Sequence, residues 1–151
     1  MSRIGDSVMN NVKTTMELLG NGMNCSQAIL AAFGKQYGLD AGIAKMLGRP
    51  LGGGMGHMAV TCGAVTAAVL ILGLAKNGQA EADARELSHA SVQELFQRFK
   101  ELHGSTDCRD LLGFDMSTEE GSKKIKEEQL TKKRCPEFVR SAATILENML
   151  A

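Results

Sequence analysis

Apolar residues recur at intervals of three and four positions along almost the whole chain, and no stretch alternates between apolar and polar residues as a strand does. This spacing places the apolar side chains on one face of an α-helix. The pattern therefore predicts an all-α fold, a single-domain bundle of about six to seven helices that spans residues 1–151. The chain contains no internal repeat and no linker.

Start and stop signals divide the first part of this pattern into elements. A first helix is expected to stop at Gly20-Asn21-Gly22. Asn24 has the character of an N-cap for a second helix that ends near Gly38, and Asp40 is predicted to cap a short third helix that ends at Gly48. The glycine-rich run that follows cannot form a regular helix at reasonable cost.

The central element is predicted to be an apolar helix at about 58–75. The segment from Met58 to Leu74 holds seventeen residues without a charge, whereas a membrane-spanning helix needs about twenty strongly apolar residues. It is also rich in alanine, glycine and threonine, so it is expected to be a buried helix and not a membrane span. Its small residues should let neighbouring helices approach closely.

The second half of the chain is more polar. A long amphipathic helix is predicted from about Glu81 to Leu102, with a buried stripe of Val92, Leu95, Phe96, Phe99 and Leu102. Residues 107–112 form a single turn or short helix, and residues 117–130 are charged and only weakly amphipathic. The last helix is expected to start at Cys135-Pro136, because proline favours the first helical position.

Charge excludes one class of function. The 151 residues include 17 basic and 17 acidic side chains, so the chain lacks the positive excess that non-specific nucleic-acid binding requires. No nucleic-acid partner is expected. The N-terminal residues include no continuous apolar stretch of the kind found in a secretory signal, and a cytoplasmic location is therefore expected.

The candidate chemistry lies in four cysteines without a C-x-x-C pair, namely Cys25, Cys62, Cys108 and Cys135. Each is expected to lie in or beside the first turn of a helix, and the four are expected to meet at one site. Unpaired N–H groups and the helix dipole favour a thiolate there, so a lowered pKa is predicted for these thiols. His57, five residues before Cys62, is a candidate base, thiolate partner or additional cofactor ligand.

The glycine run, Gly52-Gly53-Gly54-Met55-Gly56, has two interpretations. Its N–H groups could cradle a phosphate ahead of the next helix. It does not, however, match the P-loop or dinucleotide-binding patterns. A tight connection that lets the following helix pack closely is the favoured interpretation.

These features together resemble a known family. The glycine run, Thr61-Cys62-Gly63-Ala64-Val65-Thr66, the upstream Asn24-Cys25-Ser26-Gln27-Ala28 and the later single cysteines are similar to the C-G-C-A-x-x-G-C-C family of redox-active proteins. The resemblance implies that the four cysteines are the functional thiols and that Gly63 and Ala64 are close-packing neighbours of Cys62. The last glycine of the C-G-A-x-x-G core is Ala67 here.

Several functions remain open at this point. Thiol–disulfide exchange or electron transfer by a thiol-based oxidoreductase, with a redox partner protein or a small thiol, is slightly favoured, with Cys62 as the central thiol. Alternatively, Cys25, Cys62, Cys108 and Cys135 could be ligands of zinc or an iron–sulfur cluster. A third possibility is a helical interaction module without a cofactor. A homo-oligomer is compatible with any of these functions.

Overall fold

The predicted all-α fold is confirmed by a computed structural model, which describes the backbone of residues 2–151 and the side chains from residue 11 onward. Within residues 2–151 there are eight α-helices and no strand. The expected number was about six to seven, and eight are found because residues 107–112 and 117–130 each contain a helix. The helices are α1 (Ser2–Gly20), α2 (Cys25–Gly34), α3 (Ala41–Gly48), α4 (Gly63–Leu74), α5 (Glu81–His103), α6 (Cys108–Leu112), α7 (Glu119–Glu127) and α8 (Leu130–Leu150). Single 3₁₀ turns follow α2 and α3 at Lys35–Tyr37 and Arg49–Leu51.

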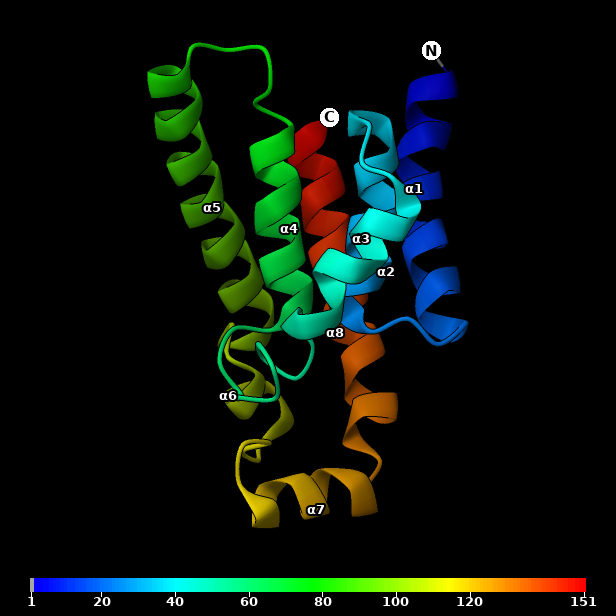
Figure 1. The fold of residues 1–151 in the computed structure, drawn as a ribbon, viewed down its shortest axis with the longest axis vertical. Coiled ribbons are helices and arrows are strands. Elements are labelled where there is room, and N and C mark those ends of the chain that lie inside the picture. Colours follow the sequence, from blue (N-terminus) through cyan, green and yellow to red (C-terminus); the bar gives the residue numbers. More distant parts are fainter. Residues whose placement is uncertain (1) are drawn as a thin grey trace.

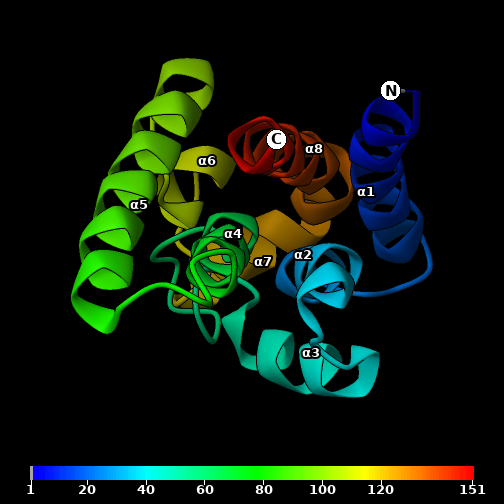
Figure 2. The ribbon, with the colours of Figure 1, turned by 90° about the horizontal axis from the view of Figure 1, so that it is seen from above.

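The helices α1, α2, α4, α5 and α8 run side by side along the long axis of the molecule (Figure 1). Seen from above, α8 lies between α1 and α5, while α2 and α4 form a second row and α3 covers the outer side of α2 (Figure 2). Helix α7 lies across the end of the bundle opposite the two termini (Figure 1). None of the helices in residues 2–151 combines the length and apolarity needed to cross a membrane.

Local capping explains where the early helices begin. The Asn24 side chain accepts a hydrogen bond of 2.8 Å from the Gln27 N–H, and the Gln27 side chain accepts one of 3.0 Å from the Asn24 N–H. This reciprocal pair is a capping box, which satisfies two N–H groups at the start of α2. The Asp40 side chain similarly accepts a hydrogen bond from Ile43 N–H at the start of α3. Both predicted caps are confirmed.

Helix α4 has the expected central position, since it packs against α2, α5 and α8. Its predicted start is wrong, however: the helix spans Gly63–Leu74 and not about 58–75. Residues 60–62, just before α4, are not helical and lie beside the start of α6. Cys62 N–H donates to Thr106 C=O at 2.8 Å, and Cys108 N–H donates to Val60 C=O at 2.6 Å. These bonds to a distant segment replace helical ones.

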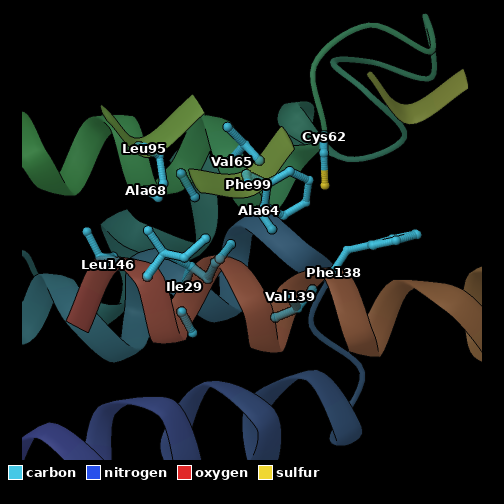
Figure 3. Close-up of a cluster of buried hydrophobic side chains, with 14 of the residues drawn as sticks. Ile29, Cys62, Ala64, Val65, Ala68, Leu95, Phe99, Phe138, Val139 and Leu146 are labelled. Atoms are coloured by element: carbon cyan, nitrogen blue, oxygen red, sulfur yellow. The ribbon is translucent and has the colours of Figure 1, made fainter. Parts of the chain in front are cut away.

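The core lies between α2, α4, α5 and α8, and Figure 3 shows Cys62 and Phe138 at the same end of this buried cluster. On α5, Leu95 and Phe99 are buried as predicted, whereas Leu102 is 62% exposed and was wrongly placed in the stripe. The inward face continues from Leu95 and Phe99 to His103, whose ring centroid is 5.0 Å from that of Phe138. Leu102 therefore points to another side of the helix.

The last helix also begins earlier than predicted. Helix α8 starts at Leu130, after Gln129 in a left-handed conformation, and Pro136 lies inside it. Cys135 is therefore in the second turn of α8 and not at its start. Because proline has no N–H, the helix forms one hydrogen bond fewer at this position, beside the candidate site.

Candidate functional site

All four cysteines line one cavity of about 370 Å³. They come from the beginnings of α2, α4 and α6 and from the second turn of α8, so the fold brings together residues that are far apart in sequence. All four thiols are free. Apolar side chains complete much of the wall, among them Leu19, Met23, Leu111, Leu112, Met116, Phe138 and Val139.

Three cysteines are positioned by helix starts. Cys25 is the first residue of α2, Cys62 directly precedes α4 and Cys108 is the first residue of α6. Thr61 and Asp107 form an antiparallel bridge that holds the last two starts side by side. The prediction that Cys135 also lies at a helix start is wrong, because α8 extends further toward its N-terminus.

Gly63 lets two helix starts approach each other. A Cβ atom at this position would lie 2.6 Å from Cys25 Sγ and 2.9 Å from the Leu51 carbonyl oxygen. The sulfur of Cys25 thus rests directly against the first residue of α4, next to Cys62. The neighbouring Ala64 is completely buried. Both residues therefore pack at the cysteines, with Gly63 closest to Cys25.

The glycine run forms a left-handed turn along the cavity. Gly53, Gly54, Met55, Gly56 and His57 have φ angles of 68°, 71°, 70°, 60° and 61°. The N–H groups of residues 55–60 donate to carbonyls of residues 50–55, so they are not free to cradle a phosphate. This arrangement supports the interpretation as a tight connection. Left-handed backbone costs roughly 1–2 kcal/mol at each non-glycine residue, so the turn holds local strain.

Gly53 and Gly54 are also required by space. A Cβ atom at Gly54 would lie 2.7 Å from Cys108 Cβ, and one at Gly53 would lie 2.6 Å from His57 Cδ2 and 2.8 Å from Met116 Sδ. The turn therefore packs against Cys108 and holds the His57 ring, which lines the same cavity. The structure thus brings the sequence candidate His57 to the site.

Burial dominates the protonation of the thiols. Burial raises the pKa of Cys108 to about 11 and of Cys135 to about 12, and it also raises the pKa of Cys25 and Cys62. The prediction of lowered pKa values at helix starts is therefore wrong. The dipole and N–H groups of a helix start offset only part of the cost of a charge in apolar surroundings.

The charge state of Cys25 affects the pKa of each of the other three thiols. After burial, a negative charge on Cys25 is the next largest cause that raises the pKa of Cys62, Cys108 and Cys135. Cys25 itself accepts hydrogen bonds from the Ser26 and Ala64 N–H groups, which oppose the effect of burial on its pKa. Ionisation of Cys25 would therefore oppose ionisation of each of the other three thiols.

Metal ligation does not follow from this arrangement. Among the described residues, no three or more His, Cys, Asp or Glu side chains form a group that could hold a metal ion. Four thiolate ligands would require the cysteines to move together and to lose their protons.

Other wall residues were missed by the sequence analysis. Arg49, Met23, Met116 and Phe138 line the cavity. Met23 precedes Asn24, and Arg49 lies just before the glycine run. This closeness in sequence is the only feature that could have indicated their place in the wall. For Met116 the sequence gives no signal, because the fold alone brings it to the cavity.

Comparison with protein families agrees with this picture of the site. Residues 23–149 match the family described as "Putative redox-active protein (C_GCAxxG_C_C)", and the match includes all four cysteines and the glycine run. Comparisons with curated proteins and with solved structures give no match. The matched region is most of the chain, and the protein therefore belongs to the C_GCAxxG_C_C family of redox-active proteins.

Proposed function

We propose that this redox-active protein is a thiol-based oxidoreductase that carries out thiol–disulfide exchange in the four-cysteine cavity. The observation that carries the proposal is the convergence of four free thiols, from four separate segments, on one cavity. Membership of a redox-active family supports the general role. A reducing compartment such as the cytoplasm would keep the thiols in this free form between reactions.

Cys25 is the best candidate for the attacking thiol. Cys25 and Cys135 are partly buried, whereas Cys62 and Cys108 are each 8% exposed. The N–H groups of Ser26 and Ala64 would stabilise the Cys25 thiolate as the proton leaves. The attack forms a mixed disulfide and releases the first thiol of the substrate.

Cys62 is the best candidate for the resolving thiol. The contact of Cys25 Sγ with Gly63, the residue after Cys62, supports a short path between the two sulfurs. Attack of Cys62 on Cys25 Sγ would complete a protein disulfide and release the second thiol. Two protein thiols are thereby oxidised and one substrate disulfide is reduced, and the two protons pass from the cysteines to the released thiols.

His57 is the candidate that accepts the first proton. Because the thiols are neutral at physiological pH, attack needs a base close to the sulfur. His57 lines the cavity and is held on the left-handed turn. An imidazole at this position could take the proton from Cys25 and return it to the departing thiolate.

The test is oxidation of the reduced protein with diamide, followed by thiol counting and peptide mapping. We expect two thiols to disappear, to return with dithiothreitol, and to map to a disulfide that contains Cys25. Cys25→Ser should abolish this disulfide, while the matched Cys135→Ser should retain it. Four thiols that stay free in the folded protein would contradict the proposal.

The same preparation tests the metal alternative. If the protein is purified without oxygen and contains zinc, or iron with sulfide, at about one site per chain, the cysteines are ligands and the exchange mechanism is wrong.

A further inference from the structure

The position of the thiols within the cavity restricts the size of a substrate. The Sγ of Cys25, the proposed attacking thiol, packs against Gly63, and Cys62 and Cys108 are each 8% exposed. The cavity of about 370 Å³ falls in the range of small-molecule sites. The left-handed turn occupies part of its wall through Gly53, Gly54 and His57. A disulfide fixed on the surface of a folded protein would have to bring bulky neighbouring groups into this space. The cavity therefore fits a small molecule better than a protein disulfide.

The wall also restricts the charge of a substrate. Among the residues whose side chains the structure describes, no aspartate or glutamate lines the cavity, and Arg49, which is exposed to solvent, is the lining residue with a permanent charge. The buried sulfurs are themselves neutral thiols, because burial raises their pKa. A charged group that moves past Arg49 to the buried sulfurs loses its hydration, and no described residue there offers an opposite charge. An ammonium group would be particularly disfavoured, because no carboxylate is present to pair with it.

We propose that the substrate of this cavity is a small, uncharged disulfide. The inference rests on the proposed function and names the substrate class of the same site. In the balanced reaction, two cysteine thiols and one disulfide RSSR give one protein disulfide and two RSH molecules. The S–S bond of the substrate breaks, the protein S–S bond forms, and both cysteine protons pass to the released thiols.

The experiment compares disulfides of matched length and different charge. Bis(2-hydroxyethyl) disulfide is neutral, whereas cystamine has ammonium groups in place of the two hydroxyls. Glutathione disulfide is both larger and charged. The loss of protein thiols is followed without oxygen, and each rate is divided by the rate at which the same disulfide oxidises dithiothreitol, which removes differences in intrinsic reactivity.

We expect the normalised rate for the neutral disulfide to exceed the rates for cystamine and glutathione disulfide by about tenfold or more. Equal normalised rates would overturn the substrate class while leaving the exchange function in place. A protein whose thiols resist every disulfide, and diamide as well, would overturn the exchange function and this inference together.

A pair of variants tests the role of the wall. Met116 is partly buried at the cavity, with its sulfur close to Gly53. Met116→Glu adds a negative charge there, and Met116→Gln has nearly the same shape without the charge. We expect the ratio of the cystamine rate to the neutral rate to be about tenfold higher in Met116→Glu than in Met116→Gln. Because the ratio is taken within one protein, changes in thiol reactivity cancel. Equal ratios in the two variants would contradict selection by charge in the cavity.

Discussion

At the scale of single residues, the four thiols are neutral side chains in apolar surroundings. Burial raises the pKa of Cys108 to about 11 and of Cys135 to about 12, from an ordinary value of 9.0. Three of the cysteines lie at helix starts, yet the N–H groups there offset only part of the desolvation. A nucleophilic thiolate at this site therefore depends on a nearby base or on groups brought in by the substrate.

Because the folded protein keeps these thiols protonated, its stability depends on pH in the alkaline range. Above about pH 9 an unfolded chain loses its thiol protons while the folded protein keeps them, so the free energy of unfolding falls as pH rises. We expect a fall of about 1.4 kcal/mol per pH unit for each such thiol until its folded pKa is reached. Below pH 9 both states are protonated and this effect vanishes. Urea unfolding with a reductant at about pH 8 and pH 10 measures it.

Cys108→Ala is the control for this prediction. The variant lacks one buried thiol and should lose less stability between the two pH values than the unmodified protein does. An identical pH dependence in the two proteins would show that Cys108 does not contribute.

At the scale of elements, Gly63 controls the approach of α2 to α4. Gly63→Ala would place a methyl group 2.6 Å from Cys25 Sγ, so we expect a loss of about 1–3 kcal/mol in stability and a displaced, less reactive Cys25. Gly73→Ala lies on the same helix with no atom within 4 Å and should be neutral or stabilising. Urea unfolding and thiol oxidation rates compare the two variants. Equal stability and equal rates would contradict the packing role of Gly63.

Glu147 is a buried carboxyl group of α8 beside Asn11 of α1. Its side chain is 5% exposed, and no described residue forms a hydrogen bond with Oε2. Burial raises the pKa of Glu147 from 4.5 to about 7, with the Asn11 side chain opposing the shift. The unfolded chain ionises first, so the stability from this group should fall as pH rises from 4.5 to 7.

Glu147→Gln tests this effect because its side chain is isosteric and does not ionise. The variant should lack this fall, and unfolding measured at about pH 5 and pH 8 in both proteins isolates it from other titrating groups. If the unmodified protein and the variant lose equal stability, Glu147 is not the cause.

The sequence predicted those element boundaries that are decided locally. Asn24 and Asp40 start their helices through side chains that bond to N–H groups three residues away, so the signal lies within one turn. The start of α4 could not be predicted, because Cys62 is held out of the helix by a hydrogen bond to Thr106. The convergence of the cysteines was a hypothesis from their pattern, but their neutral state depends on burial that only the packed bundle creates.

At the scale of the whole molecule, oxidation should stabilise the fold. A disulfide between Cys25 and Cys62 would close a loop of 37 positions and restrict the unfolded chain by about 4 kcal/mol. We expect the oxidised protein to unfold at a temperature several degrees higher than the reduced protein. Calorimetry with and without dithiothreitol measures this difference. A lower unfolding temperature after oxidation would show that the disulfide strains the bundle.

The cavity is assembled from the beginnings of α2, α4 and α6 and from the second turn of α8. During synthesis, Cys135 and Phe138 leave the ribosome after the other three cysteines have already emerged. The last wall can therefore close only when the C-terminal helix has docked. Until then the earlier thiols are open to solvent and to the reductants of the cell. The moment at which the thiols become protected from solvent would therefore mark the completion of folding.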